Sequence, residues 1–96
     1  MTNASTASAP IAEQITARLT AALAPTLLHV SNDSASHSGH MGDDGTGESH
    51  FSVTIESAAF SGVSRVQRQR LVNQALADLL RDRIHALAIK ARAPGE

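Results

Sequence analysis

The chain has 96 residues, of which 42 % are hydrophobic and 18 % charged, a composition that is typical of one globular domain and excludes a large multidomain enzyme. It contains no cysteine, which excludes disulfides, thiolate metal sites and cysteine nucleophiles and leaves histidine and carboxylate as metal ligands. The net charge of −1 is unevenly divided, because residues 1–63 carry one arginine against six acidic residues, whereas residues 64–96 carry seven basic residues against three acidic ones. The C-terminal third can therefore present a basic surface to an acidic partner or to phosphates.

The N-terminal residues predict a tail followed by a helix. Residues 1–9 are small and polar, without the basic start and apolar segment of a signal peptide, and we expect a disordered tail ahead of a single domain at residues 10–96. Apolar residues then recur every four positions, at Ile11, Ile15, Leu19 and Leu23. This stripe predicts an amphipathic helix that ends at Pro25. No apolar run reaches the roughly 20 residues that span a bilayer, so we expect a soluble, cytoplasmic protein with no membrane partner.

Two alternating segments flank a long polar stretch. Residues 26–32 alternate apolar and polar side chains and predict a short strand. Residues 33–47 consist mainly of Ser, Gly, Asp and His without apolar periodicity, and a loop of this length in a compact domain is usually functional or disordered. Residues 49–56 alternate cleanly and predict a half-buried strand, with Phe51 and Val53 on its apolar face.

The C-terminal half begins with a predicted helix. Ser64 and Gln67 have the spacing of a capping box, in which the serine hydroxyl and the glutamine amide satisfy each other's free backbone N–H groups. The helix is predicted to run to about Asp82 and to bury one apolar face. This face consists of Leu71, Val72, Ala75, Leu76, Leu79 and Leu80.

Residues 85–91 alternate again and predict a last strand with His85, Leu87 and Ile89 on one face, so the element order is αββαβ. The first two strands can pair as an antiparallel hairpin, whereas strand, helix and strand over residues 49–91 imply a parallel pair with a right-handed crossover. Parallel neighbours begin at the same end of a sheet, which places His50 near His85. The loop that carries two further histidines, His37 and His40, leads into that end, so we expect four of the five histidines at one corner.

Several short motifs resemble the BolA family in order and spacing over residues 11–94. They are Leu28-x-Val30-x-Asn32-Asp33-Ser34, His37, Gly47-Glu48-Ser49-His50-Phe51, Phe60-x-Gly62, Arg68-x-Arg70-Leu71-Val72 and Ile84-His85-Ala86-Leu87-Ala88-Ile89. The combination of Glu-Ser-His-Phe with His-Ala-Leu at this separation is the most specific part. Where relatives commonly have Arg-His-Arg, this chain has Arg68-Gln69-Arg70, which argues against an imidazole role there. The chain also stops at Glu96, before the further short helix that many relatives have.

The resemblance implies an α+β fold akin to a class II KH domain, with both helices on one face of a three-stranded mixed sheet. It also implies an adaptor rather than an enzyme. Such a protein binds a monothiol glutaredoxin and shares a [2Fe–2S] cluster that takes thiolates from the glutaredoxin and glutathione and imidazoles from the BolA protein. This function belongs to iron–sulfur cluster trafficking or iron regulation. The isolated chain is then expected to be a monomer without a cofactor.

On this resemblance the metal ligands are His85, at the family's C-terminal histidine, and His37, at its loop position. From the residues alone, His85 could equally be a hydrogen-bonded histidine at the rim of the core, and His37 a solvated loop residue. His40 and His50 are the substitute ligands, and His50 on the polar side of its strand can instead orient the loop or a ligand. A zinc site of His37, His40, His50 and nearby aspartates is an alternative, although structural zinc normally recruits cysteine.

The alternative function is that of a nucleic-acid-binding transcriptional regulator. KH-type folds bind nucleic-acid backbones, and some BolA proteins are regarded as transcriptional regulators. The contacts would be the basic residues of the second helix and the last strand, Arg65, Arg68, Arg70, Lys90 and Arg92. These residues can also form an ordinary solvated face. The only two aromatic residues are phenylalanines expected in the core, and the Gly-x-x-Gly clamp of RNA-binding KH domains is missing from the helix junction.

Overall fold

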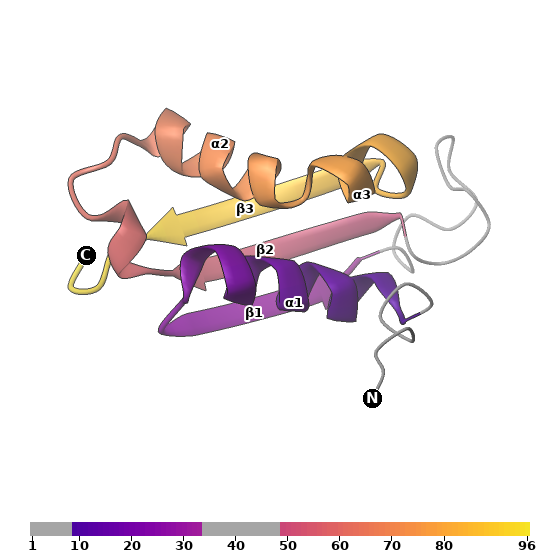
Figure 1. The fold of residues 1–96 in the computed structure, drawn as a ribbon, viewed down its shortest axis with the longest axis horizontal. Coiled ribbons are helices and arrows are strands. Elements are labelled where there is room, and N and C mark those ends of the chain that lie inside the picture. The colour runs from indigo at the N-terminus through magenta and orange to yellow at the C-terminus, as the bar shows by residue number, and fades with distance from the viewer. Residues whose placement is uncertain (1–8, 34–48) are drawn as a thin grey trace.

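The computed structural model describes residues 9–33 and 49–96 (Figure 1). Nearly all of the predicted tail and of the predicted polar loop, with His37 and His40, lies outside the described residues. The elements are α1 (Ile11–Leu23), β1 (Leu27–Asn32), β2 (His50–Glu56), the short 3₁₀ helix η3 (Ala58–Phe60), α2 (Arg65–Ala75), α3 (Ala77–Asp82) and β3 (Ala86–Arg92). The predicted order is confirmed, and the structure adds η3 and divides the second helix in two.

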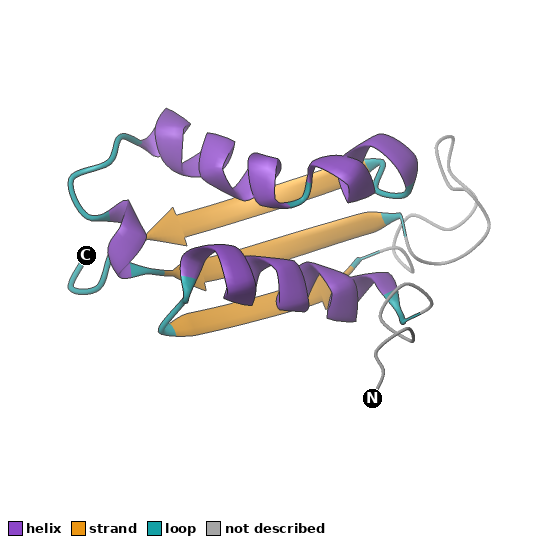
Figure 2. Ribbon diagram, in the orientation of Figure 1, coloured by secondary structure: helices purple, strands orange, loops and turns teal. Residues whose placement is uncertain are grey.

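The three strands form a mixed sheet in the order β1-β2-β3, with β1 antiparallel to β2 and β2 parallel to β3. Figure 2 shows the helices on one face of this sheet, as expected. Within β2 the residues alternate between buried and half-buried positions, so the apolar face turns toward the helices and the polar face away from them. None of the described helices is long and apolar enough to cross a membrane.

The core lies between the sheet and the helices, and its residues are those that the sequence periodicities place inward. The fully buried large side chains are Phe51, Phe60, Ile11, Ile15, Leu19, Ile55, Leu76, Val53 and Val72. Burial of these apolar side chains is the dominant stabilising contribution, at about 25 cal/mol for each Å² removed from water. Both phenylalanines are therefore core residues, as the sequence predicts.

A buried serine joins the end of α1 to the end of β2. Ala24 follows α1 in the left-handed conformation, with φ of 44°, and its N–H donates to the Thr20 carbonyl. Pro25 then prevents the helix from continuing. The Ser57 hydroxyl donates to the Leu23 carbonyl at 2.6 Å and accepts from the Ala59 N–H at 3.1 Å. One side chain thus satisfies a free carbonyl of α1 and begins η3.

The second predicted helix is interrupted at Leu76. Ser64 accepts from the Gln67 N–H at 3.2 Å, which is one half of the predicted capping box and the only half formed in the described residues. Leu76 has φ of −112° and ψ of 15°, outside helical values, and its N–H is shared between the Val72 and Asn73 carbonyls. The periodic sequence gives no sign of this break, because Leu76 remains fully buried on the same face.

Arg68 joins α2 to the residues that follow β3. Its guanidinium binds both carboxylate oxygens of Glu96, at 2.6 and 2.7 Å, and its Nε donates to the Val63 carbonyl at 2.7 Å. The guanidinium carbon also lies 6.0 Å from the centre of the Phe60 ring. The two hydrogen bonds from Arg68 lower the pKa of Glu96 from 4.5 to about 2. Arg68 is therefore part of the folded scaffold.

Replacing Glu96 with glutamine is expected to remove a pH-dependent part of the stability. A carboxyl group whose pKa falls on folding stabilises the protein above its unfolded pKa, and this contribution disappears as the pH falls through the folded pKa. The wild-type protein should therefore exceed Glu96→Gln in urea midpoint at neutral pH, and the difference should shrink between pH 4.5 and about 2. Glu13→Gln, at an exposed position of α1, is the control. A difference that does not change with pH would contradict the assignment.

Candidate functional site

Two histidines from different strands meet at one end of the sheet. The parallel register places His50 opposite Ala86, and the His85 N–H donates to the Ser49 carbonyl at 2.8 Å. The ring centroids of His50 and His85 are 6.2 Å apart, with the rings inclined at 73°. The prediction that these two histidines lie near one edge is confirmed. We refer to Ser49, His50 and His85 as the histidine corner.

His85 stands just before β3 rather than on its apolar face, which corrects the sequence prediction. The N–H groups of both His85 and Ala86 donate to the Ser49 carbonyl, at 2.8 and 3.2 Å. Two consecutive residues that donate to one acceptor are not yet in the alternating pattern of a strand. The His85 side chain is consequently exposed, whereas Leu87 and Ile89 are half-buried against the core. The His85 imidazole therefore lies at the surface of the histidine corner.

Ser49 fixes the ring of His50. Its hydroxyl lies 2.9 Å from His50 Nδ1, and Ser49 itself is completely buried. This contact engages Nδ1 and thereby fixes the orientation of the His50 ring. Sequence analysis assigns no role to Ser49, although a small polar residue directly before a histidine at the start of a strand is the available signal. His50 is half-buried and lies on the polar side of β2, as predicted.

Asp33, directly after β1, connects the end of that strand to the histidine corner. Its N–H donates to the His50 carbonyl at 2.7 Å, and its carboxylate accepts from the hydroxyls of Ser31 and Ser52. Residues 33 and 49, the two described neighbours of residues 34–48, therefore both attach beside His50. Sequence analysis gives Asp33 only as part of a motif, because its partners come from two different strands.

The side chains of the histidine corner that are able to bind a metal are two imidazoles. Among residues 9–33 and 49–96 there is no group of three or more His, Cys, Asp or Glu residues that could hold a metal ion. The remaining described histidine, His29, is exposed and pairs with Thr54 in the sheet, away from the corner. A [2Fe–2S] cluster needs four ligands. Imidazole donors without cysteine therefore fit part of a cluster's ligand set, with the other ligands supplied from elsewhere, and do not fit a cluster held by this chain alone.

The basic residues that sequence analysis assigns to nucleic-acid binding fall into two groups. Arg68 is bound to Glu96, and Arg92 donates to the Glu56 carboxylate at 3.0 Å. The hydrogen bonds from Thr26 and Arg92 lower the pKa of Glu56. The other three residues, Arg65, Arg70 and Lys90, form no ion pair within the described part of the chain. Two of the five predicted contacts are thus internally neutralised.

Comparison with known proteins gives a consistent result. A family model described as "BolA-like protein" matches residues 19–96. BolA-like protein 1 from Mus musculus is 40 % identical over 92 residues, which are 96 % of this chain and 64 % of the mouse protein. The DNA-binding transcriptional regulator BolA from Vibrio cholerae is 46 % identical over 79 residues, covering 82 % of this chain and 71 % of that protein.

Comparison with solved structures points to the same family as comparison of the sequences. The structure of the BolA domain of SufE1 from Arabidopsis thaliana matches with a TM-score of 0.78 and 38 % identity, over 90 % of this chain and 94 % of that chain. Because the family model, the relatives and the fold coincide over most of the chain, the protein belongs to the BolA family.

Proposed function

We propose that this chain is a non-enzymatic cytoplasmic adaptor that binds a monothiol glutaredoxin and supplies histidine ligands to a [2Fe–2S] cluster shared with the glutaredoxin and glutathione. Its role is in iron–sulfur cluster trafficking or iron regulation. The observation that carries the proposal is the histidine corner, where an exposed His85 lies beside His50 at one end of the sheet. Membership of the BolA family supports the same assignment.

His85 is the first ligand in this proposal and His37 the second. His37 stands four residues after Asp33, which attaches beside His50, so an extended chain could span at most ~14 Å from Asp33 to His37. His40 is the alternative on the same segment. His50 is already held by Ser49, and we assign it an orienting role with the capacity to substitute as a ligand.

The donor set explains why a partner is needed. The chain supplies imidazole nitrogen and no thiolate, so the remaining positions must be filled by the glutaredoxin cysteine and glutathione. Imidazole in place of thiolate raises the reduction potential of a cluster and is the more labile ligand. A shared cluster with labile ligands on one side suits a protein that passes the cluster on or reports its presence.

The experiment that tests the proposal is the titration of the pure chain into a monothiol glutaredoxin that holds a cluster with glutathione. We expect a complex of one chain with one glutaredoxin on size-exclusion chromatography, together with a change in visible absorption and circular dichroism. The chain incubated with iron and sulfide but without glutaredoxin, and then desalted, should show no visible absorption of a cluster. An unchanged spectrum with no complex formed would contradict the proposal.

Nucleic-acid binding is the second candidate, and it is supported by the similarity to the DNA-binding transcriptional regulator of Vibrio cholerae. The contacts left for phosphates are Arg65, Arg70 and Lys90, since Arg68 and Arg92 are paired within the fold. Replacing these three by glutamine should weaken binding to all sequences and flatten its salt dependence, because fewer counterions are released. Binding that is undetectable near physiological salt in the unmodified protein would remove this candidate.

A further inference from the structure

A groove between α2 and β3 has no role in the proposed cluster function, although two of its residues are contacts in the nucleic-acid alternative. Its volume is about 330 Å³, and it is lined by Arg65 and Gln69 of α2 and by Ile89, Lys90 and Ala91 of β3. One cationic residue of each element thus lines the groove, and none of the five lining residues is acidic. Lys90 stands between Ile89 and Ala91, which pack against the core, so its exposed side chain lies on the face of the sheet opposite α2. The groove is distant from the histidine corner, since Lys90 follows His85 by five residues, or ~16 Å along a strand.

The positive charge of this groove is not balanced by the protein. The four ion pairs of the described residues are Arg18–Asp78, Arg68–Glu96, Arg81–Asp82 and Arg92–Glu56. They engage most of the acidic side chains near α2, α3 and β3 and leave Arg65 and Lys90 without an acidic partner in the described chain. An acidic chain lying along this edge would face both cations and complement their charge.

The groove also borders an unpaired strand edge. Strand β3 is the last in the sheet and pairs only with β2 in the described structure. The Arg92 carbonyl accepts from the Ser57 N–H on the β2 side, so the alternate residues Ile89 and Ala91 direct their amide groups outward. At this edge Arg68 Nη1 lies 3.4 Å from the Ala91 carbonyl, which is consistent with that direction. An open strand edge is a template for pairing with another extended chain.

We propose that this groove binds an acidic, extended segment of a partner protein, which adds to the outer edge of β3 as a fourth strand. Its backbone pairs with Ile89. Because the side chains of a strand alternate between its two faces, its carboxylates bind Arg65 on the helix side and Lys90 on the other side, with bidentate geometry at the arginine. A second copy of this chain fits less well, because two β3 edges would bring Lys90 against a like charge. Nucleic acid fits less well because it cannot use the backbone edge, and both aromatic side chains, Phe51 and Phe60, are buried away from base stacking.

The test uses the full chain and a fluorescent peptide of about eight residues with the repeat Val-Val-Glu-Glu, which presents glutamates on both faces of an added strand. We expect saturable binding by fluorescence anisotropy and shifts of the Ile89, Lys90 and Ala91 amide signals in NMR spectra. The double variant Arg65→Glu/Lys90→Glu should weaken binding on the order of tenfold or more, since two charge-assisted contacts are lost. The milder Arg65→Gln/Lys90→Gln gives the same test if the charge reversal disturbs folding.

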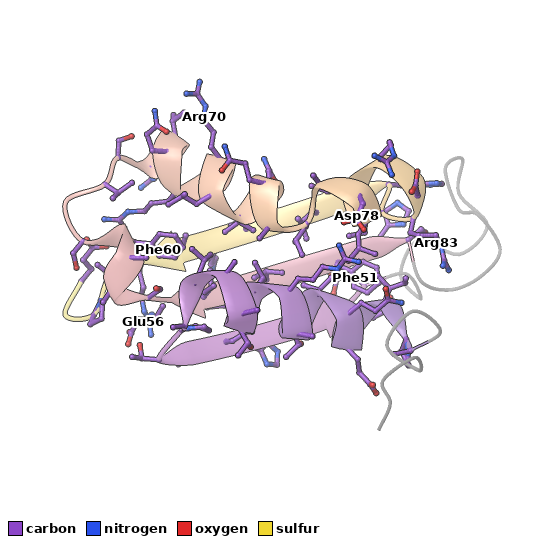
Figure 3. All side chains as sticks on the ribbon, viewed as in Figure 1. Phe51, Glu56, Phe60, Arg70, Asp78 and Arg83 are labelled. Carbon is purple, nitrogen blue, oxygen red and sulfur yellow. The ribbon has the colours of Figure 1, made fainter. Side chains whose placement is uncertain are left out.

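The matched control is Arg70→Glu/Arg83→Glu, which changes the net charge equally at two exposed arginines outside the groove. Figure 3 shows Arg70 pointing away from the body of the protein. We expect this control to leave the affinity within about twofold at physiological salt, where distant surface charges are screened. Equal weakening by both double variants would overturn the groove assignment.

Two further probes separate the alternatives. A peptide of the same charge with N-methyl groups at alternate positions should bind on the order of tenfold more weakly if its backbone pairs with β3, and equal binding would overturn strand addition. An oligonucleotide that binds more tightly than the acidic peptide, and is lost only in Arg65→Glu/Lys90→Glu, would make the groove a phosphate site and overturn the peptide proposal. Neither result depends on the cluster, so failure here leaves the proposed function untouched.

Discussion

The variant His85→Ala is expected to fold and to bind glutaredoxin like the wild-type protein, but to shorten the lifetime of the shared cluster on the order of tenfold or more. The side chain is exposed and its backbone N–H keeps the bond to Ser49, so the cost in folding free energy should be about 0.5 kcal/mol or less. Loss of even an outer partner of a ligand lowers metal affinity by about 10–100-fold, and loss of the ligand itself should cost at least as much. Visible circular dichroism of the mixed complex against time measures the effect.

The control for this variant is His29→Ala, which removes an exposed histidine from β1 far from the corner and should leave the cluster unchanged. His37→Ala should give a milder loss than His85→Ala, because His40 can substitute on the same segment. His50→Ala should alter the spectrum less than either, in keeping with an orienting role. An unchanged lifetime in the double variant of His37 and His85 would leave docking without coordination as the surviving function.

The largest loss of stability is expected for Phe60→Ala, which should reduce the free energy of unfolding by roughly 3–5 kcal/mol. Phe60 is completely buried at the end of η3, and Arg68 lies over its ring. The substitution removes the ring and leaves a cavity that the short connection between β2 and α2 cannot fill. Domains of this size are stable by only about 5–15 kcal/mol, so the substitution should remove a large part of the total stability.

Urea denaturation followed by circular dichroism measures this loss. Phe60→Leu is the matched control and should retain most of the stability, because leucine refills part of the volume and keeps the site apolar. A loss below about 1 kcal/mol for Phe60→Ala would show that the region relaxes to fill the cavity, which would contradict the close packing described here.

Most of the fold could be predicted from the sequence because its periodicities are clean. Alternation over residues 49–56 indicates β2 and its buried face, and the four-residue spacing of apolar side chains indicates α1. The break at Leu76 could not be predicted, since the apolar pattern continues through it and only tertiary burial distinguishes an interrupted helix from a regular one. η3 was missed for a related reason, because it is fixed by Ser57, whose hydroxyl binds α1 from a distance of 34 residues in the sequence.

The site could be predicted in part. Topology alone brings His50 and His85 to one end of the sheet, because parallel strands begin together, and the structure confirms this. The alternation rule fails at His85, because the N–H groups of both His85 and Ala86 donate to the Ser49 carbonyl before the regular strand begins. The placements of His37 and His40 stay predictions, since both lie outside the described residues. Sequence also gave no way to separate Arg68, which is bound to Glu96, from Arg65, which is not.

Histidine ligation of the shared cluster can be measured through the magnetic coupling between the histidines of this chain and a reduced cluster. The chain is produced with ¹⁵N-histidine and mixed with unlabelled glutaredoxin and glutathione, and the reduced complex is measured by pulsed electron paramagnetic resonance. We expect ¹⁵N hyperfine couplings of the size typical of directly bound imidazole, and the loss of at least one of them in His85→Ala. A complex that forms but has the spectrum of an all-thiolate cluster, without coupling to the labelled chain, would contradict it.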